Sequence, residues 1–235
     1  MKIYIVVFSI LFFLVQCTSS PKNAQKNLSN SVQIEFNSIE SIKTSLLKDI
    51  TFVKLETSDE ILLGDINQIE IFDDSIYILC NSGLYVFDLF GNYIKSIGNR
   101  GNGPGEFISP YSFWIDKKEN FVFILDRQLN RLQKYNIENL DYIESIIMPY
   151  ESPLGFAKMP KKNLFIYYYP LRPDRGIEKK QVFVANRNGK IISELYEGNE
   201  SGKILHGNSS NFYTFGDELM FYPYFSNKIY AIETV

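Results

Sequence analysis

Short apolar segments alternate with polar turns along most of the chain. Residues 84–87 (LYVF) lead into a turn at residues 90–92 (FGN), and residues 93–97 (YIKSI) run back from it. Segments 121–125 and 131–135 repeat this arrangement. Short apolar runs separated by turn residues are typical of antiparallel β structure. Because helical spacing of apolar residues is not sustained beyond the N-terminus, we predict an all-β fold.

The apolar segments recur as a larger unit of three strands joined by turns. Successive units begin at residues 76, 121, 164 and 219, which lie about 43 to 55 residues apart. Repeats of this length are typical of β-propellers, whose four-stranded antiparallel blades pack around an axis. Segments 32–36, 50–55 and 66–72 precede the first unit and are also predicted to be strands. We therefore predict a β-propeller.

The length of the chain limits the number of blades. Six blades of about 45 residues need about 270 residues, whereas only about 200 follow residue 31. The chain also ends at Val235, directly after a predicted strand. We therefore expect an incomplete ring of about four to five blades, from a truncated reading frame or a fragment.

The N-terminus differs from the rest of the chain. Lys2 precedes an apolar run at residues 3–15, which is short for a helix that crosses a bilayer, and Cys17 follows. This is the arrangement of a secretory signal, and its final cysteine resembles the lipidated residue of a bacterial lipoprotein. Gln16 stands where such signals usually have a small residue. A plain secretory signal and an uncleaved anchor helix are therefore alternatives.

These observations divide the chain into three parts. Residues 1–17 are predicted to be a lipoprotein-type signal peptide. Residues 18–31 are rich in Ser, Asn, Lys and Gln and are expected to form a flexible tether. Residues 32–235 are predicted to form the partial propeller domain.

Composition and cysteine content restrict the possible partners and cofactors. The net charge of -3 supplies no basic field for nucleic acid, so we expect no nucleic-acid partner. If Cys17 carries lipid, Cys80 is left alone, and neither an intramolecular disulfide nor a cysteine-rich metal site is expected. Cys80 ends an apolar run and is predicted to be buried. The single histidine, His206, argues against a multi-histidine site, so no metal and no cofactor is expected.

One stretch resembles a known family. Residues 97–107 (IGNRGNGPGEF) precede Ile115-Asp116 and residues 123–126 (FILD). This order resembles the connection between blades of NHL-type propellers and, more narrowly, the six-bladed β-propeller lipoproteins secreted by some Gram-negative bacteria. Residues 52–57 (FVKLET) resemble the first strand of that family. The resemblance covers most of the chain after Ile50.

The resemblance implies a function class and a location. We expect a non-enzymatic binding or scaffold module for a protein, peptide or glycan in the cell envelope, attached to the outer membrane through lipid on Cys17. Some six-bladed propellers are metal-dependent hydrolases or lyases of the lactonase kind, which gives the alternative. A non-functional truncated fragment is a third hypothesis. No catalytic residue is assigned, because neither a Ser-His-Asp order nor a metalloprotease motif is present.

Two groups of residues have a structural and a functional interpretation. The glycines of residues 101–105 could bind phosphate, but such a loop must lead from a strand into a helix. Here Pro104 removes one N–H donor and Glu106 adds a repelling charge, so we expect the glycines to serve the backbone. Asp88, Asp116 and Asp126 could act as acids or metal ligands, although aspartates beside strands commonly close turns.

Candidate ligand-binding residues come from an aromatic segment and nearby arginines. Tyr167 and Tyr169 share one face of a predicted strand, because side chains alternate along a strand. They could form an aromatic platform for a sugar or a peptide beside Arg172 and Arg175, although aromatic residues in strands are usually core residues. Arg127 could project towards the mouth of the channel.

Overall fold

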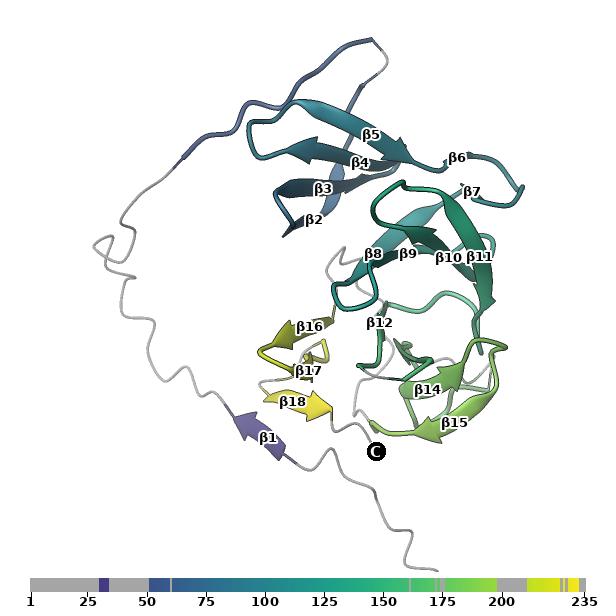
Figure 1. The fold of residues 1–235 in the computed structure, drawn as a ribbon. Coiled ribbons are helices and arrows are strands. Elements are labelled where there is room, and N and C mark those ends of the chain that lie inside the picture. Colours follow the sequence, from purple (N-terminus) through teal and green to yellow (C-terminus); the bar gives the residue numbers. More distant parts are fainter. Residues whose placement is uncertain are drawn as a thin grey trace, which may run out of the picture.

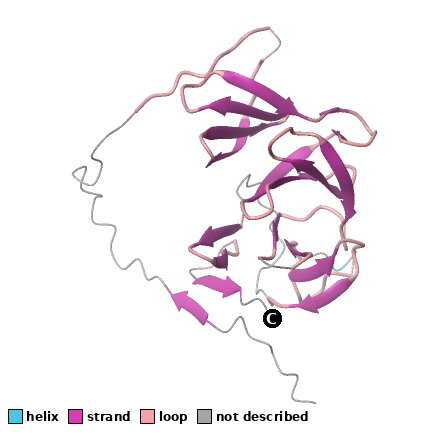
Figure 2. Cartoon of the chain, viewed as in Figure 1, coloured by secondary structure: helices cyan, strands magenta, loops and turns pink. Residues whose placement is uncertain are grey.

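The structure is a computed structural model that describes residues 30–33, 51–59, 61–160, 162–171, 173, 176–197, 211–224, 226 and 228–232. These residues form strands and turns without an α-helix, and none of them belongs to a helix that could cross a membrane. Strands dominate Figure 2. The prediction of an all-β fold is confirmed.

The strands are β1 (Asn30–Gln33), β2 (Ile66–Phe72), β3 (Ser75–Cys80), β4 (Gly83–Asp88), β5 (Tyr93–Ile97), β6 (Asn99–Arg100), β7 (Glu106–Phe107), β8 (Pro110–Asp116), β9 (Phe121–Asp126), β10 (Arg131–Asn136), β11 (Tyr142–Ile147), β12 (Gly155–Lys158), β13 (Leu164–Tyr168), β14 (Val182–Asn186), β15 (Ile191–Glu194), β16 (Phe212–Phe215), β17 (Glu218–Phe221) and β18 (Lys228–Ile232).

Four antiparallel sheets of four strands each make up the fold, and they follow one another in a ring (Figure 1). We call them blades. Blade 1 has the order β2-β3-β4-β5, blade 2 the order β8-β9-β10-β11, blade 3 the order β12-β13-β14-β15, and blade 4 the order β16-β17-β18-β1. The predictions of four-stranded propeller blades and of an incomplete ring are confirmed.

The first strand of each blade lies innermost. Contacts between blades run from β2 to β8, from β8 to β12 and from β12 to β16. In blades 1 to 3 the predicted unit corresponds to the second, third and fourth strands, and in blade 4 its two predicted strands are β17 and β18. The inner strands β8, β12 and β16 were not predicted. β8 begins at a proline in a segment expected to be a loop, and β12 and β16 have only four residues each.

Blade 4 combines the two ends of the described chain. β1 pairs with β18 in antiparallel register, from Asn30 opposite Ala231 to Gln33 opposite Lys228. The strand predicted at 32–36 is therefore present but begins earlier, so that β1 overlaps the end of the expected tether.

The strand predicted at residues 50–55 is wrong where the structure describes it. Residues 51–57 form no strand, and Phe52 is 93% exposed. The segment instead lies along the turn between β4 and β5. There Glu56 donates its N–H to the Gly91 carbonyl at 2.7 Å, and its carboxylate accepts the Tyr93 N–H at 2.8 Å.

Apolar side chains fill the spaces between neighbouring blades. Phe107 belongs to the cluster between blades 1 and 2. Phe123 and Phe165 meet edge to face between blades 2 and 3, with ring centroids 5.3 Å apart. Tyr168 and Phe221 do the same between blades 3 and 4 at 5.0 Å. Blades 2 and 3 therefore bury both of their faces, as radial packing requires.

The glycine-rich connection at residues 97–107 joins blade 1 to blade 2. Its two short strands, β6 and β7, pair in parallel, and Phe107 at its end is buried between the blades. Gly98 and Gly105 have φ angles of 70° and 73°, which lie in the left-handed region that favours glycine. Of the three glycines at residues 101–105, only Gly105 has a left-handed φ, so the expectation is confirmed there. At Gly101 and Gly103 the glycine instead leaves room for the Glu106 carboxylate, because a Cβ would lie 2.1 and 2.9 Å from its Oε2.

The loop between β6 and β7 satisfies its polar groups internally. Gly103 donates its N–H to the Glu106 carboxylate at 2.7 Å. Arg131 Nη2 donates to the carbonyls of Gly103 and Glu106 at 3.0 and 3.2 Å. β7 then leads into strand β8 rather than into a helix. Glu106 thus occupies the position where a phosphate cradle would receive its anion.

We predict that Gly98→Ala lowers the free energy of unfolding by about 3 kcal/mol. A left-handed alanine is strained, and over-packing adds to the loss. A Cβ at this position would lie 2.5 Å from Phe107 Cε1 and 2.9 Å from the Tyr135 hydroxyl oxygen. Chemical denaturation of the purified protein measures the change.

Two other glycines serve as controls. Gly176 has a φ of +78°, and no atom lies within 4 Å of the position that a Cβ would take there. Gly176→Ala therefore tests backbone strain alone, with an expected loss of about 1 kcal/mol. Gly64 has neither a left-handed φ nor a close neighbour, and its replacement should change stability little. Equal losses at Gly98 and Gly64 would contradict the prediction.

Candidate functional site

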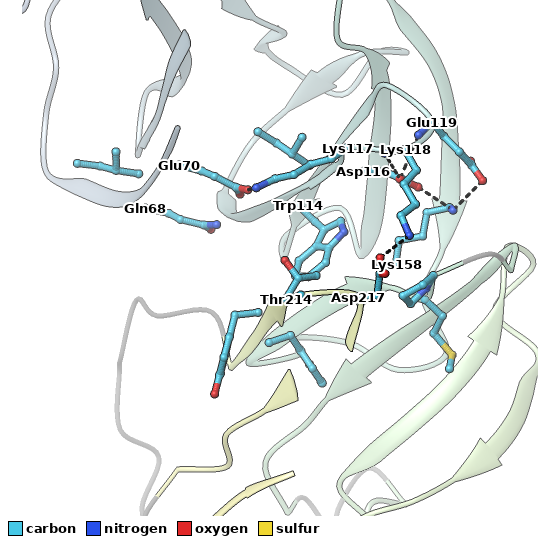
Figure 3. A pocket seen from close by; sticks show the side chains of 17 residues that line it. Gln68, Glu70, Trp114, Asp116, Lys117, Lys118, Glu119, Lys158, Thr214 and Asp217 are labelled. Atoms are coloured by element: carbon cyan, nitrogen blue, oxygen red, sulfur yellow. Dashed lines mark hydrogen bonds and ion pairs between the residues drawn. The ribbon is translucent and has the colours of Figure 1, made fainter. Parts of the chain in front are cut away.

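A pocket of about 620 Å³ lies where the inner strands of the four blades meet, and Figure 3 shows it from close by. We call it the axial pocket. Every blade contributes to its wall. The lining residues are Gln68, Ile69, Glu70, Trp114, Ile115, Asp116, Lys117, Lys118, Glu119, Lys158, Met159, Pro160, Phe212, Tyr213, Thr214, Gly216 and Asp217.

The repeated topology explains why these residues converge. On this face of the propeller, the inner strand of each blade ends and a turn leads into the second strand. The turn after β8 therefore supplies Lys117 to Glu119, the turn after β12 supplies Met159 and Pro160, and the turn after β16 supplies Gly216 and Asp217. Most of these turn residues are exposed and polar, whereas Met159 is buried in the cluster between blades 3 and 4.

A buried lysine links blades 2 and 3 at the wall of the pocket. Lys158 is 6% exposed, and its Nζ lies 2.7 Å from Asp116 Oδ2 and 3.2 Å from Glu119 Oε1. Asp116 Oδ1 also accepts the backbone N–H groups of Lys118 and Glu119 at 3.1 and 3.2 Å. The Asp116 carboxylate thus closes its turn and neutralises a cation that has little access to water.

Glu70 and Lys117 form the link between blades 1 and 2. Lys117 Nζ lies 3.3 Å from Glu70 Oε1. Burial raises the pKa of the Glu70 carboxyl group, and the positive charge of Lys117 opposes this shift. Nearby, the Gln68 side chain donates to the Phe113 carbonyl at 2.9 Å and accepts the Phe113 N–H at 3.0 Å. Gln68 therefore bonds the inner edge of β8 much as a neighbouring strand would.

A third ion pair crosses from blade 2 to blade 4. Lys118 Nζ lies 3.0 Å from Asp217 Oδ1, and both side chains are largely exposed. Figure 3 shows the three pairs around the indole of Trp114. Trp114 packs against the clusters on both sides of blade 3, so part of this side chain lies between blades.

The aromatic segment of β13 is buried. Tyr167 and Tyr169 lie in the cluster between blades 2 and 3, whereas Tyr168 lies in the cluster between blades 3 and 4. The predicted alternation is therefore confirmed. All three tyrosines are 0% exposed, because both faces of this blade are covered, and burial raises the pKa of Tyr167 and Tyr169. Neither ring is open to stack on a ligand, so in this structure they serve as core residues instead of the expected platform.

The predicted arginines fall in different places. Arg127 lies in the turn between β9 and β10, and its guanidinium covers the Tyr111 ring at 4.3 Å from the centroid. Tyr111 lies near the start of β8, whereas Asp116 at the end of β8 lines the pocket. Arg127 therefore lies on the opposite face of the propeller from the axial pocket. Arg172, Arg175 and the proposed lipidation site Cys17 lie outside the described residues.

The remaining candidates have structural roles. Asp88 accepts the N–H groups of Phe90 and Asn92 at 2.9 and 2.8 Å, and its hydrogen bond from the Asn92 side chain lowers its pKa. Asp126 is buried and accepts four backbone N–H groups of the neighbouring loops. Cys80 is buried, as predicted. Within the described part of the chain, no three His, Cys, Asp or Glu side chains gather as a metal site.

A family model described as a 6-bladed β-propeller matches residues 22–235. The chain belongs to this 6-bladed β-propeller family. No curated protein is significantly similar to it.

A solved structure agrees with the fold. A protein of Bacteroides fragilis that is described as exported has a TM-score of 0.70 and 24% sequence identity. The likeness covers 79% of this chain and 52% of that protein, so the chain spans about half the length of this neighbour. Two weaker likenesses are to the computationally designed protein Ika4 and to a Bacteroides caccae protein of unknown function. Ika4 has a TM-score of 0.46 and 10% identity over 79% of this chain and 99% of its own. The Bacteroides caccae protein has a TM-score of 0.42 and 12% identity over 55% of this chain and 48% of its own.

We predict that Lys158→Met lowers the free energy of unfolding by about 3 kcal/mol, because it leaves the Asp116 carboxylate without its cation in a poorly solvated place. The double variant Lys158→Met, Asp116→Asn should lose less than the sum of the two single variants. Thermal or chemical unfolding of the four proteins measures this coupling.

Lys118→Met is the matched control. It removes a lysine of the same turn whose ion pair is exposed, and exposed pairs contribute about 0.5 kcal/mol or less. A loss at Lys158 no larger than the loss at Lys118 would show that the buried link contributes nothing special.

Proposed function

We propose that this protein is a non-enzymatic binding module of the bacterial cell envelope, with its ligand bound in the axial pocket. The observation that carries the proposal is the convergence of all four blades on one cavity of about 620 Å³. Binding pockets for small molecules and short chains typically measure about 300 to 1,000 Å³ and combine apolar walls with a few polar groups.

The chemistry of the pocket favours binding over hydrolysis. Metal-dependent hydrolases and lyases need carboxylates that remain available to a metal ion or a proton. Here Glu70, Asp116 and Asp217 each lie within 3.3 Å of a lysine ammonium group. These carboxylates already have cationic partners, which supports binding over metal-dependent hydrolysis.

The N-terminal sequence supports a place in the envelope. Lys2, the apolar run at residues 3–15 and Cys17 have the order of a lipoprotein signal. A structural neighbour from Bacteroides fragilis is described as exported, which agrees with this location. We therefore propose that lipid on Cys17 holds the propeller at the membrane, with the outer membrane as its site.

Filling the pocket should abolish binding. We expect Thr214→Trp to lose the peptide or glycan ligands that the wild type selects from displayed libraries, because an indole in the lining would occupy the cavity. Thr57→Trp places the same side chain on an exposed residue outside the lining and should bind as the wild type does. Ligands retained by Thr214→Trp with unchanged affinity would refute the pocket as the binding site.

The anchor has a separate test. We expect Cys17→Ala to move the protein from the membrane fraction to the soluble fraction when cells are fractionated, because a thioether-linked lipid needs the cysteine sulfur. Metabolic labelling with a palmitate analogue should mark the wild type and not the variant. Unchanged partition together with absent labelling of the wild type would contradict the lipid anchor.

A further inference from the structure

The cations of the axial pocket are already neutralised by the protein. Lys117, Lys118 and Lys158 each pair with a carboxylate from a neighbouring or facing blade at 3.3, 3.0 and 2.7 Å. A strongly charged ligand would compete with these pairs, and the cost would be largest at the buried Lys158, whose displacement would leave Asp116 uncompensated. The pocket therefore favours a ligand without net charge.

Neutral hydrogen-bonding groups lie in the same wall. Trp114, Tyr213 and Thr214 line the pocket, and within the described residues their indole N–H and hydroxyl groups have no hydrogen-bond partner. The same wall includes Ile115 and Met159. A sugar ring fits this mixture, because its C–H face packs on aromatic and apolar groups while its hydroxyls bond to polar groups at the edge.

The shape of the pocket favours a chain of sugar units. Ile69 of β2 and Tyr213 of β16 belong to blades 1 and 4, the two ends of the series of blades. They are 55% and 40% exposed, so the wall of the pocket continues onto accessible side chains there. A ligand can therefore extend beyond the cavity along Ile69 and Tyr213.

An extended peptide suits the pocket less well. Peptides in extended form commonly bind by pairing with the free edge of a strand. At β8 the inner edge is already used at Phe113, because the Gln68 side chain bonds both its N–H and its carbonyl. At this point of β8 a peptide could not pair with the backbone and would be recognised through side chains.

We infer that the axial pocket binds a neutral oligosaccharide, with Tyr213 and Trp114 packing against sugar rings and the Lys–carboxylate pairs bonding sugar hydroxyls. This inference rests on the proposed function, because it names the ligand class of the same site. It assigns Tyr213 as a ligand-binding residue in place of the buried Tyr167 and Tyr169.

Titration calorimetry with neutral gluco-, manno- and xylo-oligosaccharides of about three to six units tests the inference. We expect one series to bind the wild type and Tyr213→Ala to weaken that binding about fivefold to tenfold, as expected for loss of one aromatic contact. Tyr222→Ala is the matched control. Tyr222 is 44% exposed, but it follows β17 at the other end of the ring, so its replacement should leave affinity unchanged.

Trp114→Phe retains a ring in the same place and removes the indole N–H, so it should weaken the sugar about threefold without unfolding the protein. Binding that Tyr213→Ala and Trp114→Phe leave unchanged overturns the inference, as does tighter binding of acidic uronate oligomers than of neutral sugars. A peptide that binds and is lost in Thr214→Trp, with no neutral sugar bound, overturns the sugar assignment and leaves the proposed function intact. Failure of all sugars and peptides to bind overturns both.

Discussion

A blade with two apolar faces must be covered on both sides, and the rest of this structure depends on that constraint. Along β13, Tyr167 enters the cluster with blade 2 while Tyr168 enters the cluster with blade 4, and both are fully buried. No single sheet could satisfy such a strand, because the other face would remain in water. Radial packing resolves the problem for blades 2 and 3 by giving each of them a neighbour on either side.

This constraint also explains what could be predicted from the sequence. Apolar runs with turn residues between them identify most of the second, third and fourth strands, because the signal for such a strand lies in a few consecutive residues. The glycine-rich connection at 97–107 was recognised by its resemblance to a propeller family, and the structure gives a physical reason for two of its glycines, since Gly98 and Gly105 have left-handed backbone angles. The solvent exposure of side chains was harder to predict. The alternation of Tyr167 and Tyr169 was correct, yet no periodicity tells whether one face or both faces of a strand are covered.

The pocket could not be predicted, for a physical reason. Its pairs join residues that lie far apart in the chain, as in Glu70 with Lys117 and Lys118 with Asp217. Each residue taken alone is an ordinary polar residue near a turn. Their meeting depends on how blades follow one another around the ring, and no local signal encodes that geometry. The short inner strand β12, which ends at Lys158, illustrates the same limit.

The same ion pairs hold the blades together and determine the electrostatics of the pocket. Lys158 can be buried only because Asp116 and Glu119 compensate the loss of hydration, and these carboxylates come from the neighbouring blade. Removing a charge to adapt the pocket to an ionic ligand would therefore weaken contact between blades 2 and 3. A neutral ligand avoids this conflict, because it can bond to the paired charges without separating them. Its binding would add contacts between blades and so stabilise the ring by mass action.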